Sequence, residues 1–385
     1  MQSGQIKVLH LLATMPVGGA EDLVAAAVKG LDPRRFEAAA ACIGEPGAIG
    51  EELRAAGYPV ASLGLDLRRT PFPRLIAAVR GLLKEMRPDI LHTHLYHPNL
   101  YGRLAALGLN LPGVVAAVHN SYHRVKFHRR GWNFLLALVT DRVLVGSTRV
   151  WQDVRRFDGV PVRKLTLLPY GIPLAEPEPA LSREEARTRL GVSGFVLGAV
   201  GRLEEQKGHR YLLEAVTELA GRLPDLKVLL VGEGRQRQKL ESLVRELGVA
   251  EVVRFLGTRR DLPLIYRALD LFVLPSLWEG LPLALLQAMG SGLPVVATRV
   301  SGVQEAVQDG LTGRLVAPGD AGALTEAILE LYARPKTRLR LGEAARATVR
   351  ENYSQEAMLR QLERLYLEVL QSKGLRSAPG KVQTS

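Results

Sequence analysis

The amino-acid sequence predicts an α/β fold, with parallel sheets covered by helices on both faces. Short apolar runs that suit buried strands alternate with amphipathic stretches that suit helices, and this alternation continues through most of the chain. The chain has 385 residues, of which 47% are hydrophobic, so it holds enough material for two domains. The strands expected in the first half are 6–12, 38–43, 60–63, 89–93, 114–118 and 142–145.

Cysteine content and the lack of long apolar runs indicate a soluble chain in a reducing cytoplasm. Cys42 is the single cysteine, which rules out an intramolecular disulfide, and its apolar surroundings predict a packed core thiol rather than a nucleophile. No apolar run approaches the length needed to span a bilayer. Residues 1–15 are interpreted as a buried strand rather than a signal peptide, because His10 interrupts the apolar run.

The net charge of +12 indicates a basic surface that can attract nucleic acid, anionic lipid or phosphorylated substrates. The sharpest basic cluster is the segment 123–130, HRVKFHRR. A solvated surface segment, a membrane-surface contact and a site for an anionic acceptor all stay open for it. Nucleic-acid binding is disfavoured, because no recognised binding module accompanies the charge.

Two glycines follow the first expected strand and precede a helix over 20–30. Gly18 and Gly19 would let the backbone of this loop approach a ligand at the helix start. Their spacing differs from the G-x-G-x-x-G pattern of dinucleotide-binding proteins. A nicotinamide-dependent enzyme is therefore disfavoured.

Several histidines lie at the ends of expected strands. His92, His94 and His97 suggest a metal cluster, but no Cys or acidic ligand stands at a suitable spacing, so cleft-lining or packed histidines are favoured over zinc. His119 directly follows the apolar run 113–118, which places it at the carboxyl edge of a strand. It is a candidate site residue, with a packed core histidine as the alternative.

The second half opens with a linker and a cationic loop. Residues 174–180 contain several Pro and Glu residues without periodicity, as linkers do, and a helix over 182–190 follows, with Ser182 and Glu185 at capping-box spacing. The strand 194–200 leads into a loop that carries Arg202 and Lys207. Between a strand and a helix these cations can neutralise phosphate groups. The alternative is a pair of solvated cations.

The segment 271–298 is a strand, a polar loop, a helix and a second strand. Pro282 stands where a first helical residue tolerates it, and Gly290 to Gly292 would end the helix. The loop, with the amides of the helix start, belongs at the carboxyl edge of the sheet. Glu279 stands in this loop, either as a ligand contact or as a charge favoured by the helix dipole.

This segment resembles the retaining glycosyltransferases of family 4, which carry S-x-x-E-G-x-P-x-x-x-x-E-A-M-A-x-G-x-P-V-V-A-T at their donor site. Gln287 stands where the family has its second Glu, and an amide lacks the charge-assisted hydrogen bond of a carboxylate. Residues on or close to the pattern are Ser276, Glu279, Gly280, Pro282, Ala288, Met289, Gly290, Gly292 and Pro294 to Thr298.

Other segments carry the same resemblance. The family's G-R-L-x-x-x-K-G motif is reproduced over 201–208, and its G-G-A-E opening over 18–21. Tyr170 replaces the Asn of the family's P-N-G-I, and Ser301 replaces the first Gly of its G-G-x-x-E. The turn 231–234 matches V-G-x-G, and 252–257 matches V-x-F-L-G.

The resemblance implies the GT-B architecture, two Rossmann-like domains that face each other across a cleft. Residues 1–175 would form an acceptor-binding domain and 182–352 a nucleotide-sugar-binding domain. Residues 353–372 would form a crossover helix that returns to the first domain, and their apolar residues do recur at helical spacing. The tail 373–385 is expected to be disordered.

The implied reaction moves a sugar from a nucleotide diphosphate sugar to an acceptor hydroxyl, with retention at the anomeric carbon and without a metal or other cofactor. Glu279 and His119 would contact the sugar, Arg202 and Lys207 would stabilise the departing diphosphate, and Gln287 would hold the ribose. The implied donor contacts are Gly18, Gly19, Arg202, Lys207, Gly232, Gly234, Leu256, Glu279, Gly280, Leu281, Pro282, Leu283 and Gln287.

The donor base (UDP or GDP) and the acceptor stay open. The basic first half favours a lipid-linked acceptor in cell-envelope polysaccharide, lipopolysaccharide or glycolipid synthesis, with peripheral contact of the enzyme at an anionic inner membrane face. A soluble acceptor is the alternative. Other functions on this architecture are an epimerase, a phosphorylase or a non-catalytic nucleotide-sugar-binding subunit.

Overall fold

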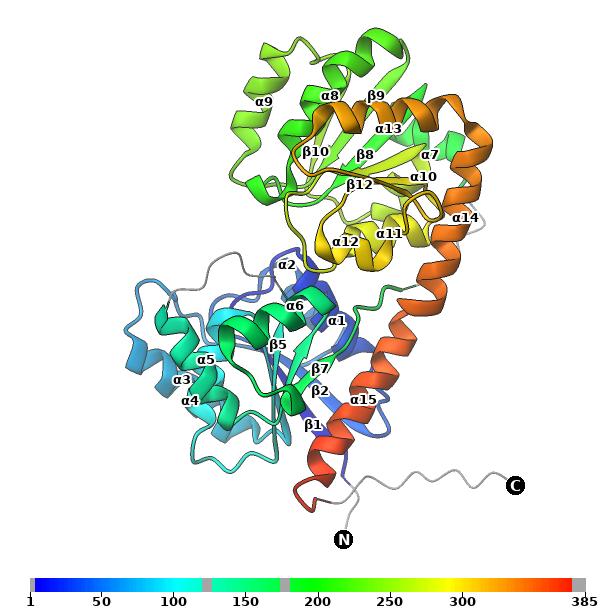
Figure 1. Ribbon diagram of the computed structural model, residues 1–385. Coiled ribbons are helices and arrows are strands. Elements are labelled where there is room, and N and C mark those ends of the chain that lie inside the picture. Colours follow the sequence, from blue (N-terminus) through cyan, green and yellow to red (C-terminus); the bar gives the residue numbers. More distant parts are fainter. Residues whose placement is uncertain (1–3, 120–126, 174–180, 376–385) are drawn as a thin grey trace, which may run out of the picture. The chain divides into compact units, whose positions relative to one another are not determined.

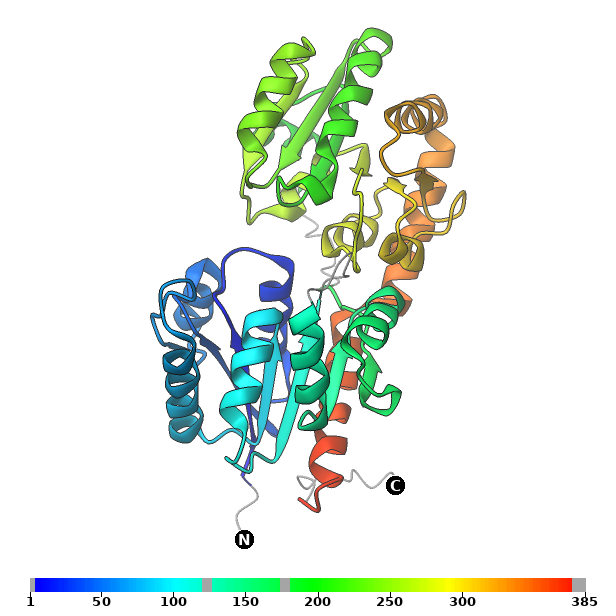
Figure 2. The ribbon, with the colours of Figure 1, turned by 60° about the vertical axis from the view of Figure 1, so that its left-hand side comes forward.

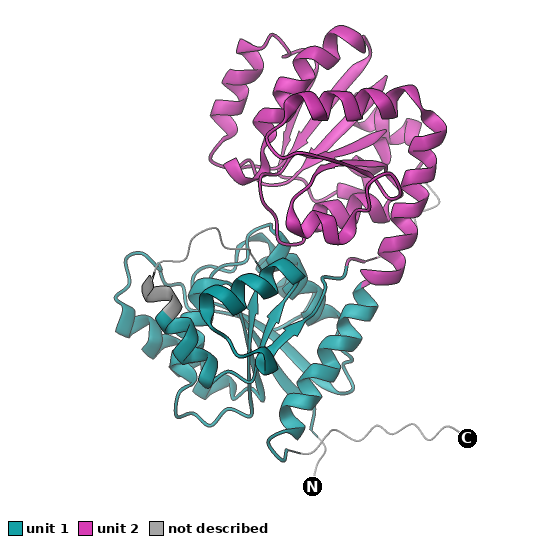
Figure 3. Cartoon of the chain, in the orientation of Figure 1, with its two compact units in different colours: residues 1–171, 355–385 teal, residues 172–354 magenta. Residues whose placement is uncertain are grey.

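The computed structural model describes residues 4–119, 127–173 and 181–375, with the side chains of 127–130 left out. The chain divides into two compact units (Figure 3). Unit 1 combines residues 1–171 with 355–385, and unit 2 spans 172–354.

Unit 1 contains a parallel sheet whose seven described strands are arranged in the order β3-β2-β1-β4-β5-β6-β7 (Figure 1). The chain extends the sheet from β1 toward β3, then returns to the other side of β1 with β4. The topological switch point therefore lies between β1 and β4. The strands are β1 (Ile6–Leu12), β2 (Phe36–Cys42), β3 (Val60–Ser62), β4 (Ile90–His94), β5 (Gly113–Val118), β6 (Arg142–Val145) and β7 (Leu165–Leu167).

Helices cover both faces of this sheet (Figure 2). Side chains alternate along β1, so Leu9 and Leu11 pack in one apolar cluster with α3 and α4, while Leu12 packs in another with α1 and α2. Cys42 is a buried free thiol in the second cluster, as predicted. The helices are α1 (Gly19–Gly30), α2 (Gly47–Ala55), α3 (Phe72–Met86), α4 (Tyr96–Ala106), α5 (Phe127–Leu138) and α6 (Thr148–Asp153), followed by the π-helix η1 (Val154–Asp158) and the 3-10 helix η2 (Val162–Lys164).

The last helix, α15 (Gln355–Gln371), follows unit 2 in the sequence but packs on unit 1, where it contacts α1 and β5. Met358, Leu362 and Tyr366 are buried on its inner face. Helix α15 thus begins at Gln355, two residues after the start of the predicted crossover helix 353–372.

Unit 2 repeats the doubly wound arrangement, with six described parallel strands in the order β10-β9-β8-β11-β12-β13. Its switch point lies between β8 and β11. The strands are β8 (Phe195–Val200), β9 (Leu226–Val231), β10 (Val253–Gly257), β11 (Leu271–Leu274), β12 (Val295–Thr298) and β13 (Arg314–Val316). The helices are α7 (Arg183–Leu190), η3 (Glu205–Lys207), α8 (His209–Arg222), α9 (Arg237–Glu246), α10 (Leu262–Ala268), α11 (Leu283–Gly290), α12 (Ser301–Ala306), α13 (Ala321–Ala333) and α14 (Pro335–Asn352).

Local signals read from the sequence set several of these boundaries. Ser182 and Glu185 form the predicted capping box at the start of α7. We expected Pro282 to be the first residue of α11, but it is the N-cap, and the helix begins at Leu283. Gly292, with φ of +77°, follows the end of α11. Among the helices that the structure describes, none has both the length and the apolar character required to cross a membrane.

Candidate functional site

The switch point of unit 2 brings two predicted segments together. The loop 201–208 follows β8 and the loop 275–282 follows β11, and β8 and β11 are paired in parallel. Both loops therefore leave the same carboxyl edge of the sheet, where ligands bind in doubly wound folds. The backbone amide of Leu277 donates to the carbonyl of Gln206 at 2.8 Å and ties the loops together.

An ion pair joins these two loops. Lys207 Nζ lies 2.6 Å from Glu279 Oε1, and only 15% of the lysine side chain and 6% of the glutamate side chain are exposed. Ser276 Oγ donates to the same carboxylate oxygen at 2.7 Å, and Gln206 Nε2 donates to Oε2 at 3.3 Å. Three donors thus hold the Glu279 carboxylate in one orientation at the edge of the sheet.

Glycines allow the close backbone approaches around this pair. Gly208 has φ of +61°, and a Cβ at this position would lie 2.1 Å from the carbonyl oxygen of Pro275. A Cβ on Gly232 would lie 2.0 Å from the carbonyl oxygen of Gly201, and one on Gly234 would lie 2.4 Å from that of Leu203. Gly232 and Gly234 therefore let the turn after β9 pack on the cationic loop.

Arg202 is exposed in the same loop. Within the described parts of the chain, its side chain makes no hydrogen bond or ion pair. It lies close in sequence to the buried Lys207–Glu279 pair and is not neutralised by it. An exposed cation at this edge of the sheet suits an anionic ligand.

Gln287 lies on α11, where its side chain is anchored by a tyrosine. The hydroxyl hydrogen of Tyr266 is shared between Gln287 Oε1, at 3.1 Å from Tyr266 Oη, and the carbonyl oxygen of Ala284, at 3.2 Å, and burial raises the pKa of Tyr266. Because the carbonyl end of the amide accepts this hydrogen bond, the amino end of Gln287 remains a donor. The remaining predicted contacts of unit 2 also lie along or just after strand ends: Leu256 in β10, and Gly280, Leu281, Pro282 and Leu283 between β11 and α11.

In unit 1 the predicted residues lie at the carboxyl edge of the other sheet. Gly18 is the N-cap of α1 and Gly19 its first residue, at the end of the loop that follows β1. His119 follows β5. Gly18, Gly19 and His119 therefore follow strand ends, as expected from the sequence. His119 also belongs to a larger cluster of side chains.

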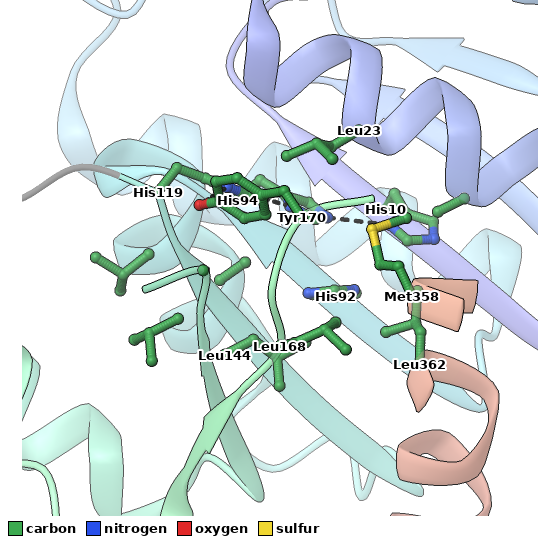
Figure 4. A pocket seen from close by; sticks show the side chains of 15 residues that line it. His10, Leu23, His92, His94, His119, Leu144, Leu168, Tyr170, Met358 and Leu362 are labelled. Carbon is green, nitrogen blue, oxygen red and sulfur yellow. Dashed lines mark hydrogen bonds between the residues drawn. The ribbon is translucent and has the colours of Figure 1, made fainter. Parts of the chain in front are cut away.

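Four histidines gather on one face of this sheet (Figure 4). His10 in β1 pairs in register with His92 in β4, and His94 lies two residues further along the same face. His10 Nδ1 lies 3.0 Å from His94 Nε2, and His94 Nδ1 lies 3.1 Å from His119 Nε2. His10 was not singled out as a site residue from the sequence. Its place two positions before Leu12 puts both side chains on the same face of β1.

The chain of contacts ends on a tyrosine. His119 Nδ1 lies 2.9 Å from Tyr170 Oη, so both ring nitrogens of His119 are occupied. Gly146 makes room for the tyrosine ring, because a Cβ there would lie 2.2 Å from Tyr170 Cζ. Tyr170, noted in the sequence only as a replacement for Asn, is therefore a further member of the cluster.

Burial keeps these histidines neutral. It lowers the pKa of His10 to about 3 and that of His119 to about 4, and it lowers those of His92 and His94 well below the usual 6.5. A neutral imidazole donates through one nitrogen and accepts through the other, so His10, His94, His119 and Tyr170 can form one directed chain of hydrogen bonds.

Three of the histidines also have the spacing of a metal site. Nitrogens of His10, His92 and His94 all lie within 4.8 Å of one another. Among the residues that the structure describes, none hydrogen-bonds to the Nε2 atoms of His10 and His92, whereas His92 Nδ1 lies 2.7 Å from Tyr366 Oη. The sequence disfavoured zinc because no Cys or acidic ligand stands at a suitable spacing. In the structure His10, from the neighbouring strand, adds a third imidazole to those of His92 and His94.

Three predictions fall partly or wholly outside the described residues: the basic cluster 123–130, whose side chains are not described, the linker 174–180, and residues 376–385 of the tail. The described part of the tail contains Lys373, whose Nζ lies 2.9 Å from Asp141 Oδ2.

Two family models match the chain. The model described as Glycosyltransferase Family 4 matches residues 17–176, and the model described as Glycosyl transferases group 1 matches residues 194–334. The first match contains His92, His94 and His119 of the histidine cluster but begins after His10, and the second contains the Lys207–Glu279 pair.

One curated relative resembles the chain over most of its length, and another over less than half of it. It is 34% identical over 305 residues to the D-inositol 3-phosphate glycosyltransferase of Corynebacterium urealyticum, covering 72% of this chain and 71% of that protein. It is 37% identical over 178 residues to LpsE of Rhizobium meliloti, a lipopolysaccharide core biosynthesis glycosyltransferase, covering 46% and 50%.

Solved structures share the fold. HepE of Anabaena, crystallised with UDP and glucose, has a TM-score of 0.84 at 22% identity, covering 94% of this chain and 99% of HepE. WaaG, a glycosyltransferase involved in lipopolysaccharide biosynthesis, has a TM-score of 0.76 at 20% identity, covering 93% and 99%. With two doubly wound units, a GT-B fold and a corynebacterial relative aligned over more than two thirds of both proteins, the chain belongs to the family 4 glycosyltransferases.

Proposed function

We propose that this glycosyltransferase moves a sugar from a nucleotide diphosphate sugar to an acceptor hydroxyl with retention at the anomeric carbon. The observation that carries the proposal is the buried Lys207–Glu279 pair at the switch point of unit 2. Structures of HepE contain UDP and UDP-glucose, which supports a UDP-sugar as the donor. A GDP-sugar is the other donor to be tested.

The diphosphate would be neutralised by side chains of the loop after β8. Arg202 is exposed there, and Lys207 projects from the last residue of η3. Two cations beside a departing diphosphate stabilise the negative charge that grows in the transition state. We therefore propose that the reaction needs no metal ion.

Glu279 would orient the transferred sugar. Its carboxylate is already held by Ser276, Gln206 and Lys207, so accepting hydrogen bonds from sugar hydroxyls requires little reorganisation. Gln287 would meet the ribose with its amino group, because Tyr266 occupies its carbonyl oxygen. This arrangement would partly compensate for the missing carboxylate.

His119 would line the sugar side of the site. Since Tyr170 and His94 occupy its two ring nitrogens, a hydrogen bond to the sugar would have to replace one of these contacts. We propose that Tyr170 holds the imidazole orientation when His94 is displaced.

The acceptor is proposed to be lipid-linked and to belong to cell-envelope polysaccharide, lipopolysaccharide or glycolipid synthesis. LpsE is named for lipopolysaccharide core synthesis and the corynebacterial relatives for D-inositol 3-phosphate. The first name supports a lipid-linked acceptor, whereas the second names a soluble phosphorylated cyclitol, so a soluble phosphorylated acceptor is the alternative to be tested. With a lipid-linked acceptor, the enzyme would work at the cytoplasmic face of a membrane.

The first test measures donor binding and turnover in EDTA. Thermal unfolding with UDP, GDP and ADP should show protection by one nucleotide, since a ligand at about 100 times its dissociation constant adds about 2.7 kcal/mol. Release of that nucleotide from its sugar donors should then proceed in EDTA. Loss of release in EDTA with recovery on adding Mg²⁺ would contradict metal independence.

The site assignment is tested with Glu279→Gln, for which Glu326→Gln is the control, because 77% of the Glu326 side chain is exposed in the same unit. We expect kcat to fall by about 100-fold in Glu279→Gln, as when one preorganised group of a transition-state site is lost. The control should keep wild-type turnover. Equal turnover in the two variants would remove Glu279 from the site.

A further inference from the structure

Two buried imidazole nitrogens in the sheet of unit 1, His10 Nε2 and His92 Nε2, have no hydrogen-bond partner among the residues that the structure describes. The two side chains are 0% and 3% exposed, so neither ring is open to bulk solvent. Buried polar atoms in folded proteins are nearly always paired, with a protein group, an ordered water molecule or an ion. The two nitrogens therefore indicate that this face of the sheet holds a ligand.

A cavity lies beside these atoms (Figure 4). It has a volume of about 40 Å³, and the rings of His10, His92, His94 and His119 line it together with apolar side chains. All of its lining residues belong to unit 1. A single water molecule needs roughly 10–15 Å³ of such volume. The cavity thus has room for an ion and one bound solvent molecule.

Ring nitrogens of three histidines converge at this cavity. One nitrogen each from His10, His92 and His94 lies within 4.8 Å of the other two. The ring centroids of His92 lie 4.2 Å from those of His94 and 5.1 Å from those of His10. Nitrogens that bind one tetrahedral zinc ion at about 2.0–2.1 Å lie about 3.4 Å apart, so the rings need to move by about 1 Å to enclose an ion.

The second nitrogens of two of these rings make the contacts that metal-bound imidazoles make. His92 Nδ1 lies 2.7 Å from Tyr366 Oη, and His94 Nδ1 lies 3.1 Å from His119 Nε2. A metal-bound imidazole donates its second N–H to a neighbouring acceptor, which fixes the tautomer and the orientation of the ring. Tyr366 and His119 can accept these hydrogen bonds while the Nε2 atoms of His92 and His94 bind an ion.

The donor set selects the class of metal. Imidazole nitrogen suits Zn²⁺, Cu²⁺, Ni²⁺ and Co²⁺, whereas Mg²⁺ and Ca²⁺ take oxygen ligands. Burial favours neutral rings, and only a neutral imidazole has a free lone pair for a metal. Among the described residues that line the cavity, none is a carboxylate. A fourth ligand, which would also offset part of the charge of the ion, would therefore come from solvent.

We propose that His10, His92 and His94 form a binding site for a divalent transition-metal ion such as Zn²⁺, with hydroxide or chloride from solvent as the fourth ligand. The ion would join β1 to β4 and, through Tyr366, to the returning helix α15. Its role is structural, because the proposed transfer reaction uses the cations of unit 2. An ordered water molecule is the competing occupant, since it could donate to both unpartnered nitrogens.

The test is equilibrium dialysis of Zn²⁺ against the full, metal-free chain without a polyhistidine tag, followed by elemental analysis. We expect one tightly bound ion per chain. His10→Asn should weaken binding at least about 100-fold, since the loss of even a second-shell partner costs 10- to 100-fold. His97→Asn, at an exposed histidine of α4 outside the cluster, is the matched control and should bind as the wild type. Equal affinities of the two variants would overturn the proposal.

A conservative variant tests the acceptor of His92. Tyr366→Phe keeps all three imidazoles and the ring that packs on them, but it removes the hydroxyl that fixes the orientation of His92. We expect about tenfold weaker binding of Zn²⁺. Circular dichroism of each variant in the metal-free state shows whether it is folded, so that a loss of binding is not mistaken for a loss of structure.

X-ray absorption at the zinc edge identifies the ligands in the wild type, without any substitution. We expect three imidazoles at about 2.0–2.1 Å and one further light or chloride ligand. An ion surrounded by oxygen ligands alone would overturn the proposal. So would a wild-type chain that binds no Zn²⁺, and the two unpartnered nitrogens would then be assigned to an ordered water molecule.

These measurements do not depend on turnover. A chain that binds Zn²⁺ through the cluster but releases no nucleotide from a sugar donor would contradict the proposed function and leave the metal site intact. A chain that turns over its donor but binds no Zn²⁺ would do the reverse.

Discussion

The two units have the same doubly wound topology but contain opposite chemistry at their switch points. In unit 2 the loops after β8 and β11 meet in an ion pair, Lys207 with Glu279. In unit 1 the neighbouring strands β1 and β4 carry imidazoles that meet on one face of the sheet and that burial keeps neutral. The difference shows that topology fixes where a site lies, whereas the local supply of counter-charge decides whether the site is ionic or neutral.

The contrast arises because Glu279 and the buried histidines have different hydrogen-bond and charge partners. A buried charge persists when an opposite charge and hydrogen bonds accompany it, and Glu279 has Lys207, Ser276 and Gln206. The histidines have one another and tyrosine hydroxyls, which pair with several of the nitrogens of the neutral rings but cannot compensate a positive charge. Each unit should therefore respond differently to acid and to loss of one partner.

The largest expected effect is on acid stability. The histidines of unit 1 bind protons below about pH 6.5 in the unfolded chain, but His10 and His119 bind them only near pH 3 to 4 when folded. The unfolded state thus holds more protons in this window, so stability is full above it and falls as pH falls, by about 1.4 kcal/mol per pH unit for each such histidine. Unfolding in urea at pH 7.5, 6 and 5 measures this slope.

Replacing one histidine sharpens the test. His10→Asn removes one titrating group and should reduce the slope of unfolding free energy against pH by up to about 1.4 kcal/mol per unit. His97→Asn, at an exposed position, should leave it unchanged. His209 in unit 2, whose pKa burial lowers to about 4, adds to the slope of that unit. An unaltered slope in His10→Asn would contradict the neutral cluster.

The second effect is the cost of breaking the ion pair. Lys207→Met leaves the Glu279 carboxylate buried without its counter-charge, which should lower the free energy of unfolding by about 3 kcal/mol. Lys207→Met/Glu279→Gln removes both charges and should recover most of this loss while remaining inactive. Arg210→Met, which breaks the exposed pair with Glu214, should cost less than about 1 kcal/mol. A double variant no more stable than Lys207→Met would show that the pair acts through something other than charge.

Sequence patterns predicted the elements well because their causes are local. Apolar runs placed the strands to within about two residues, and the spacing of Ser182 and Glu185 gave the capping box. The resemblance to family 4 was confirmed over both halves.

The contacts within each site were not predictable from local patterns. Lys207 and Glu279 are 72 positions apart and meet because β8 and β11 are neighbours in the sheet. His10 meets His92 for the same reason between β1 and β4. His92 also contacts Tyr366, 274 positions away on the returning helix. The order of the strands in each sheet and the return of α15 to unit 1 decide these contacts, and neither can be predicted from the pattern of a single segment of sequence.

The third effect concerns the contact between Gly146 and the ring of Tyr170, the tyrosine at the end of the histidine cluster. Gly146→Ala would put a Cβ into the Tyr170 ring and should cost about 2 kcal/mol, typical of overpacking in a tight core. Adding Tyr170→Asn removes the ring and should restore much of the stability. Gly81→Ala, in open space on α3, should be neutral or slightly stabilising. If Tyr170→Asn gives no recovery, the glycine is required for its backbone rather than for the ring.

The smallest expected effect is on nucleotide binding in unit 2, the unit whose site contains the ion pair. Gln287→Glu would still accept from Tyr266, now through a carboxylate that can also accept from ribose hydroxyls with charge-assisted strength. We expect about fivefold tighter binding of the nucleotide that protects the wild type, about 1 kcal/mol. Calorimetry measures this change.

The same titration with the 2′,3′-dideoxy nucleotide isolates the ribose, because the gain should vanish when no hydroxyl can donate. Gln287→Ala should weaken binding of the parent nucleotide, since the amide donor is lost along with its anchor on Tyr266. A gain that persists with the dideoxy nucleotide would mean that the new carboxylate acts elsewhere in unit 2. Weaker binding in Gln287→Glu would mean that the site has adapted to an amide donor, so that a second negative charge near the diphosphate costs more than the ribose contact returns.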